Sequence, residues 1–213
     1  MFGMDIETIF ILAVIFVISI SMHEYAHALM SHKLWDNLPE MQWRLTPNPI
    51  AHIDPIGFLA IFIIHFWWGR PVQVNPANYK NPLRDELLVS LAWPFSNILM
   101  ALVGSFTLAI FIKFGVMTEI LMNFFQMFIF INIALAVFNM IPIPPLDGYR
   151  IIKFLKPEYG YWMEKHMMYF SIGLLILIFL PGNFLGYFIQ AVVYPIFETF
   201  VSIAGMVVGV NFY

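Results

Sequence analysis

The chain has 213 residues, of which 61% are hydrophobic and 11% are charged, and its mean hydropathy is +0.82. These values exclude an ordinary soluble domain and are typical of an integral membrane protein. The net charge of −3 and the thin spread of the ten Lys and Arg residues argue against a nucleic-acid partner. Because the chain has no cysteine, disulfides, thiolate metal ligands and a cysteine nucleophile are excluded.

The first predicted element is one long helix over residues 6–33, a stretch that contains neither Gly nor Pro. Such a helix reaches about 40 Å, which exceeds a hydrocarbon core of about 30 Å. The stretch lacks a basic start and a small-residue cleavage site, so we expect a retained spanning helix and not a secretory signal.

Within this helix, the sequence HEYAH contains His23, Glu24 and His27. The two histidines are four residues apart, so their imidazoles face the same side of a helix and can bind one cation. Ionisable groups in a spanning segment are costly and therefore indicate function. The pattern H-E-x-x-H is typical of zinc hydrolases, in which two imidazoles hold the metal and the glutamate takes a proton from water.

A short apolar piece over residues 56–68 follows, and 13 residues are too few for a full crossing. If this piece re-enters and returns, nine of the ten Lys and Arg residues lie on one side and only Lys113 lies on the other. If it spans, the best division is seven to three. The positive-inside rule favours re-entry, with the N-terminus outside and the basic side in the cytoplasm.

Further long apolar runs are bounded by charge, Pro or Gly and cover residues 87–112, 120–141, 167–180 and 184–208. The predicted fold is an all-α integral membrane protein. It is a polytopic bundle of about five spanning helices, with residues 56–68 as a short re-entrant or sixth segment.

After the first helix we predict a small β-like membrane-associated stretch, in which residues 41–47 could offer an edge to extended substrate. No repeat, low-complexity tract or soluble domain is visible. The chain is therefore predicted to form a single membrane domain over residues 1–213, with a catalytic core at about 6–156 and additional C-terminal helices at about 160–208.

A tetrahedral zinc site needs a third protein ligand, and the best candidate lies in the sequence FNMIPIPPLDGYR. Asp147 follows a spanning run, directly after prolines that forbid continued regular helix. Irregular backbone at membrane depth is tolerated only where it lines a cavity or is buried in protein, so an acid there indicates function. Asp54, which precedes a proline near His52, is a rival ligand that spacing alone does not exclude.

The sequence resembles the site-2 protease family of intramembrane zinc metalloproteases, in the compact form without PDZ or CBS domains. The resemblance runs from the first helix to about residue 156 and rests on HEYAH, NPIAHIDPIG, RPVQVNPANYKNPLRD, AWPFSN and NMIPIPPLDG. It implies that one Zn²⁺ per chain is bound by His23, His27 and Asp147. It also implies that Glu24 is the catalytic base and that Asn139 lies near the scissile carbonyl.

The resemblance further implies hydrolysis of a peptide bond within or near a transmembrane segment of a membrane-protein substrate, by zinc-activated water. The partners it implies are that substrate and the lipid bilayer, without nucleic acid, and it leaves the oligomeric state open. The expected location is a prokaryotic cell membrane, with the active site near the cytoplasmic side. One residue departs from the family pattern: Trp93, in AWPFSN, stands where the pattern has Gly, and this bears on substrate access.

Three alternative functions are weighed against the protease. A membrane metal-binding or transport protein would need acidic or His residues along several spans, whereas residues 167–180 and 184–208 contain only Glu198. A di-iron hydroxylase would need about eight clustered histidines, and this chain has six scattered ones. A catalytically silent protease relative is the third alternative, and Trp93 is its support.

Overall fold

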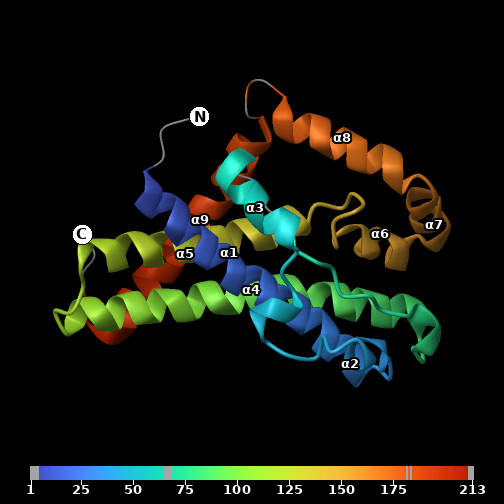
Figure 1. Ribbon diagram of the computed structural model, residues 1–213, viewed down its shortest axis with the longest axis horizontal. Helices are drawn as coiled ribbons and strands as arrows, with labels where there is room; N and C mark the ends of the chain where they lie inside the picture. Colours follow the sequence, from blue (N-terminus) through green and yellow to red (C-terminus); the bar gives the residue numbers. More distant parts are fainter. Residues whose placement is uncertain (1–4, 65–68, 181, 183, 211–213) are drawn as a thin grey trace.

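The computed structural model describes residues 5–64, 69–180, 182 and 184–210. These residues form helices joined by turns and irregular segments, with no β-strand among them (Figure 1). The predicted all-α polytopic membrane fold is confirmed. Four helices are long and apolar enough to cross a membrane: α1 (Ile6–Lys33), α4 (Pro82–Lys113), α5 (Glu119–Asn139) and α9 (Phe184–Val208).

Shorter elements connect or flank these four helices. They are α2 (Leu38–Met41), α3 (Pro55–Ile64), α6 (Tyr149–Leu155), α7 (Pro157–Lys165) and α8 (Met167–Phe179), with 3₁₀ turns at Pro49–Ala51 and Pro76–Asn78.

Local sequence signals define where the long helices begin. The Asp5 side chain accepts a hydrogen bond from the Thr8 N–H at 2.7 Å and caps α1. Pro82 occupies the first turn of α4, where its missing N–H has no intrahelical partner to lose. Thr118 caps α5 by accepting from the Leu121 N–H. The first helix covers the predicted span, residues 6–33.

The membrane core forms where α4, α5 and α9 pack together. Figure 1 shows α4 and α5 running side by side with α1 crossing them, and α1 contacts both. A hydrogen bond of 3.1 Å from Asn97 to Asn132 joins α4 to α5 inside the bundle, where both side chains are buried. The buried apolar residues of this core are Ala101, Leu108, Ile129, Ile133, Val193 and Val201.

The run predicted as a span over residues 167–180 forms a helix of nearly that extent, but the helix is not of spanning length. This helix is α8, whose 13 residues reach only about 20 Å, less than a hydrocarbon core of about 30 Å. The helix packs on α7 and α9 and stands beside the bundle in Figure 1. Four helices of spanning length are therefore present in the described part of the chain, instead of the predicted five.

The β-like stretch predicted after α1 is not confirmed. Over residues 34–64 and 69–81 the structure has short helices, 3₁₀ turns and irregular backbone, with an isolated antiparallel bridge between Ile53 and Gly69. Pro39, Pro47 and Pro49 lack the N–H that a β-ladder needs, which explains why no regular strand forms.

The same bridge indicates how the predicted re-entrant piece runs. Ile53 and Gly69 lie side by side, and the Arg70 N–H donates to the His52 carbonyl at 2.9 Å. The chain that leaves at Ile53 therefore returns to the same place, although residues 65–68 of the piece lie outside the described residues. This return agrees with the predicted re-entry.

Asp36 joins the end of α1 to the segment that precedes α4. Its buried carboxylate accepts hydrogen bonds from Ser31 Oγ (2.9 Å), Leu38 N (3.2 Å), Asn75 N (2.8 Å) and Asn78 Nδ2 (2.7 Å). Burial raises the pKa of Asp36, but these hydrogen bonds outweigh it, so the pKa lies below its ordinary value. Asp36 therefore fixes residues 75–78 beside the end of α1.

We expect Asp36→Asn to lower the free energy of unfolding by about 3 kcal/mol, because an amide cannot accept all four hydrogen bonds and leaves buried donors unpaired. Since the folded pKa of Asp36 is depressed, its contribution is complete above the unfolded pKa of about 3.9 and is lost as pH falls through the folded pKa. The two proteins should thus differ in melting temperature at pH 7, begin to converge as pH falls below about 4, and meet only below the folded pKa of Asp36. Thermal unfolding in detergent micelles measures this, with the exposed Glu40→Gln as control; a constant difference across pH would contradict it.

Candidate metal centre

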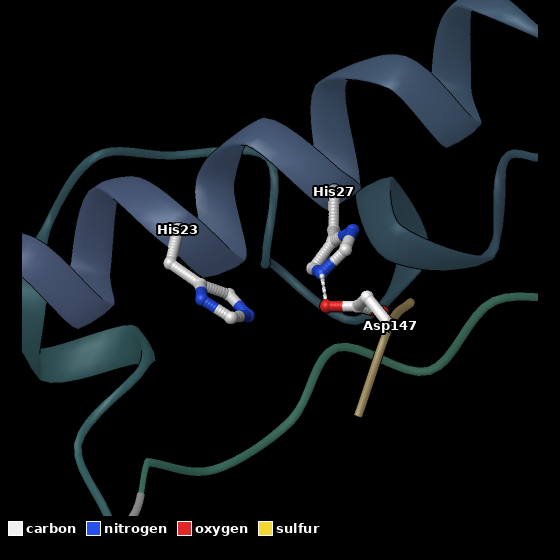
Figure 2. Close-up of side chains that lie close together, drawn as sticks. All are labelled: His23, His27 and Asp147. Atoms are coloured by element: carbon white, nitrogen blue, oxygen red, sulfur yellow. Dashed lines mark hydrogen bonds and ion pairs between the residues drawn. The ribbon is translucent and has the colours of Figure 1, made fainter. Parts of the chain in front are cut away.

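Three possible metal ligands converge where α1 passes the loop before α6. Figure 2 shows His23 and His27 projecting from one helix toward Asp147. Each residue offers one ligand atom, and these atoms lie within 4.8 Å of one another. The His27 Nε2 atom is 3.2 Å from Asp147 Oδ2.

The tautomer of His27 follows from its second contact. Its Nδ1 atom lies 2.9 Å from the Val89 carbonyl oxygen of α4, which can only accept, so Nδ1 carries the hydrogen. The Nε2 atom then points a lone pair at the Asp147 carboxylate. Metal-ligating histidines commonly donate their other N–H to a carbonyl in this way.

The donor set fits a zinc ion. With the hydrogen of His27 on Nδ1, His27 Nε2 and Asp147 Oδ2 are two acceptors that face each other, an arrangement that a shared cation between them satisfies. Two imidazoles and one carboxylate match the ligands of catalytic zinc sites, which keep a fourth position open. A cavity of about 240 Å³ adjoins the cluster and has room for water and substrate atoms.

Glu24 is positioned beside the cluster by a backbone contact. Its buried carboxylate places Oε1 at 3.5 Å from His23 Nε2, while Oε2 accepts a 2.7 Å hydrogen bond from the Val72 N–H. One oxygen is thereby held and the other faces the cluster. The sequence could not predict the role of Val72, because any residue except proline supplies the same N–H.

The proline-rich loop that carries Asp147 is closed by a backbone hydrogen bond. The Gly148 N–H donates to the Asn139 carbonyl at 2.7 Å, which brings the end of the loop back to the end of α5. A Cβ added to Gly148 would lie 2.3 Å from the Met140 carbonyl oxygen and 2.6 Å from that of Ile141. Only glycine fits there, so the sequence Asp-Gly has a steric cause.

Gly148→Ala is expected to displace the loop and to lower bound zinc at least tenfold, because the added methyl group meets rigid backbone and moves Asp147. Metal analysis of the purified variant measures the loss. Gly173→Ala is the matched control, since an added Cβ meets no atom within 4 Å there. Equal zinc in the Gly148 variant and the wild type would contradict this account of the loop.

Asn139 lines the same cavity as the three candidate ligands and Glu24. Its side chain donates to the Leu135 carbonyl at 3.3 Å, a long hydrogen bond that is easily exchanged.

Arg150 reaches the cavity from α6, one helical turn after Asp147. It pairs with Glu86 of α4 at 3.4 Å, and Lys153 bonds both Glu86 (2.7 Å) and Glu164 (2.8 Å). These ion pairs tie α6 to α4 and α7 and so support the loop that carries Asp147. The pairs with Glu86 could not be predicted from the sequence, because their partners are more than 60 residues apart in the chain.

Asp54, the rival third ligand, lies elsewhere. Its Oδ1 accepts from the Gly57 N–H at 2.8 Å at the start of α3, so it acts as a helix cap. It is not part of the ligand cluster found among the described residues. His52 is also engaged apart from the cluster, with Nε2 at 2.7 Å from the Thr46 carbonyl.

Trp93, the departure from the family pattern, packs against the cluster from α4. Its ring centroid is 4.1 Å from that of His23, and the side chain is fully buried. Trp93 is not among the residues that line the cavity. The indole therefore fills the contact between α1 and α4 and leaves the cavity open.

Comparison with known proteins agrees with this geometry. The profile of a family described as "Peptidase family M50" matches residues 111–180. The "Putative zinc metalloprotease YwhC" of Bacillus subtilis is 41% identical over 151 residues, which cover 68% of this chain and 69% of that protein. The "Putative zinc metalloprotease Rip2" of Mycobacterium tuberculosis (strain H37Rv) is 27% identical over 187 residues, which cover 85% and 71% of the two chains. No solved structure matches.

Proposed function

Because this chain belongs to peptidase family M50, the site-2 proteases, whose metal is zinc, we propose that it is an intramembrane endopeptidase. Its substrate is a membrane protein that is cut within or near a transmembrane segment. The observation that carries the proposal is a convergence of side chains. His23, Glu24 and His27 lie on a helix of spanning length, and Asp147 meets the two histidines from the loop before α6. His27 lies six residues before Lys33, about 9 Å inside the end of α1.

In the proposed mechanism His23, His27 and Asp147 hold the zinc ion. A bound zinc ion would act as a Lewis acid: it would polarise the scissile carbonyl and lower the pKa of a bound water. The Val89 carbonyl keeps the hydrogen of His27 on Nδ1, so that Nε2 remains a ligand. Gly148 and the ion pairs of α6 hold Asp147 in reach of His27.

Glu24 is the proposed base. It accepts a proton from water as the water oxygen bonds to the scissile carbonyl carbon, and it delivers that proton to the amine nitrogen when the C–N bond breaks. The Val72 N–H keeps the carboxylate oriented through both steps. The Asn139 amide donates a hydrogen bond to the carbonyl oxygen, where negative charge develops.

The substrate must unwind before it can react. A peptide bond in a transmembrane helix is shielded by its own hydrogen bonds and side chains, so a local extended segment has to enter the cavity. That cavity is lined by Pro71 and Pro145, which have no N–H, and by Val72 and Val74. We propose that this wall receives the unwound segment.

A channel or transporter is not favoured by the described residues. They contain one group of three or more potential metal ligands, and a path across the membrane would need several. A second function is therefore not proposed.

We further propose that the N-terminus is outside and that the site opens toward the cytoplasm, as the charge asymmetry suggests. Single cysteines at Ala77 and Glu158 should react only when an impermeant thiol reagent reaches the cytoplasmic face, and one at Val116 only from outside. All three positions are exposed, and no native thiol interferes. The reverse pattern of labelling would invert the proposed orientation.

The proposed activity is tested with purified protein in proteoliposomes and a panel of single-span substrates. Cleavage should stop after zinc is removed with a chelator and return when zinc is added back. Cleavage that persists without metal would overturn the proposal.

A further inference from the structure

A second, cationic cleft lies behind the wall of the catalytic cavity. It has a volume of about 540 Å³, and its charged residues are Arg44 and Arg70. Gln42 and Gln73 add polar groups and are hydrogen-bonded to each other at 2.9 Å, and Trp43 forms part of the exposed lining. The mechanism proposed above uses none of these side chains.

Arg44 is built into this cleft. Its guanidinium donates to the carbonyls of Ala51 and Arg70, and the side chain is only 5% exposed. Arg70 itself is exposed and follows the bridge between Ile53 and Gly69. The two cations thus lie on adjoining segments. Arg44 supports the backbone, and the exposed Arg70 can contact a ligand.

The depth of the cleft follows from contacts with α1. Gly69 packs so closely on Ile20 that a Cβ would lie 2.5 Å from that side chain, and the Val72 N–H bonds Glu24. Ile20 and Glu24 precede the end of α1 at Lys33 by about 20 Å and 13 Å, respectively. Arg70, between Gly69 and Val72, therefore lies well inside the span of α1.

Neither arginine is in an ion pair within the described part of the chain, and none of the residues that line the cleft is acidic. The carboxylate that acts electrostatically on Arg44 is that of Glu24, which lies in the catalytic cavity and not in the cleft. Charged side chains at such depth are costly and normally face a polar cavity or an opposite charge. A guanidinium presents donors that match a carboxylate, so an anion is the complement that the cleft lacks.

The cleft and the catalytic cavity share one wall. Val72 and Val74 line the catalytic cavity, whereas Arg70 and Gln73 line the cleft, and Pro71 borders both. The cleft and the catalytic cavity therefore adjoin at Pro71.

We propose that the Arg44–Arg70 cleft is a specificity subsite that binds an acidic side chain carried inside the transmembrane segment of the substrate, near the cut. This inference rests on the proposed function. It predicts that the enzyme selects spanning segments that contain an Asp or Glu, which are rare because such residues are costly in a bilayer.

The depth of the cleft favours this ligand over a lipid headgroup. Phosphate groups of phospholipids lie outside the hydrocarbon region, whereas Arg70 lies between the levels of Ile20 and Glu24. An acidic side chain of a spanning segment can reach that depth.

The test measures binding and needs no hydrolysis. Fluorescent single-span peptides of about 25 residues carry one Asp, Asn or Lys, moved stepwise along the segment. They are titrated by anisotropy against the Glu24→Gln protein in neutral detergent micelles. We expect the Asp peptide to bind about tenfold more tightly than the Asn peptide, at only one or two neighbouring positions.

Variants of the exposed arginine assign the effect to the cleft. In the Glu24→Gln background, Arg70→Gln should remove the preference for Asp without changing the binding of the Asn peptide, and Arg70→Glu should transfer the preference to Lys. Arg84→Gln is the matched control, because Arg84 is an exposed arginine that pairs with Asp85 and does not line the cleft. Arg44 is left intact, since it supports two backbone carbonyls.

Three outcomes would overturn the subsite. The first is equal binding of the Asp and Asn peptides at every position. The second is a preference for Asp that survives Arg70→Gln. The third is loss of the preference when phosphatidylglycerol is added, which would assign the cleft to lipid phosphate. Chelator-sensitive cleavage without any preference for Asp would leave the proposed protease standing and reject the subsite alone. Peptides of all three kinds that fail to bind would count against both.

Discussion

Glu24→Gln is expected to retain one zinc ion per chain and to lose peptide hydrolysis by a factor of about 10²–10⁴. The substitution keeps the size of the side chain and its hydrogen bond from the Val72 N–H, while it removes the group that accepts a proton. Zinc content and turnover should therefore separate. Metal analysis and the initial rate of cleavage of a single-span substrate, measured on the same preparation, provide the test.

A matched control for this variant is Glu40→Gln. Glu40 is an exposed glutamate of α2 that pairs with His32 at 3.6 Å, away from the cavity. Its substitution should leave both zinc and turnover unchanged. An unchanged rate in the Glu24 variant would remove the base from the mechanism.

Asp147→Ala is expected to lower the affinity for zinc by at least about two orders of magnitude, because it removes one of three protein ligands and leaves His27 Nε2 without its partner. Asp54→Ala should leave zinc bound, since Asp54 caps α3 and stands apart from the cluster. The Asp54 variant should cost only about 1 kcal/mol of stability, as for other helix caps. Titration of zinc against a competing chelator measures both affinities.

The two variants form a pair with opposite expectations. Loss of zinc in the Asp54 variant and its retention in the Asp147 variant would move the third ligand to the loop between α1 and α3. The proline-rich loop would then have no role in the metal site.

The sequence was most informative where chemistry follows helical periodicity. His23 and His27 are one turn apart, so a helix alone brings their imidazoles to the same side, and the structure has that helix over Ile6–Lys33. Asp147 could be named as a candidate because three nearby prolines break the helix at membrane depth. Its competition with Asp54 needed coordinates, because spacing along the chain says nothing about how loops approach α1.

Interactions of backbone groups and of distant pairs were beyond sequence reasoning. The Val72 N–H that holds Glu24 belongs to every non-proline residue alike. The Asp36 contacts join residues about forty positions apart. The predicted β-like stretch was not found among the described residues, and the prolines in that region remove N–H groups that a β-ladder needs. The count of five spans was wrong because the run over residues 167–180, which Pro181 ends, has only 14 residues and is too short to cross.

The interpretation of Trp93 changed once its neighbours were known. As a sequence feature, a bulky indole in place of glycine suggested an obstacle to substrate. In the fold it is fully buried against His23 and does not line the cavity, so it supports a candidate ligand. A silent enzyme therefore has no structural support from this residue.

The most direct test of the central claim is the mass of the products formed from a single-span substrate in proteoliposomes. The account predicts two complementary fragments whose masses sum to that of the substrate plus one water, with the cut inside the transmembrane segment. The fragments should be absent when zinc is chelated and absent with Glu24→Gln. A cut confined to a soluble flank, or fragments that form equally in the Glu24 variant, would contradict the assignment of this site as an intramembrane protease.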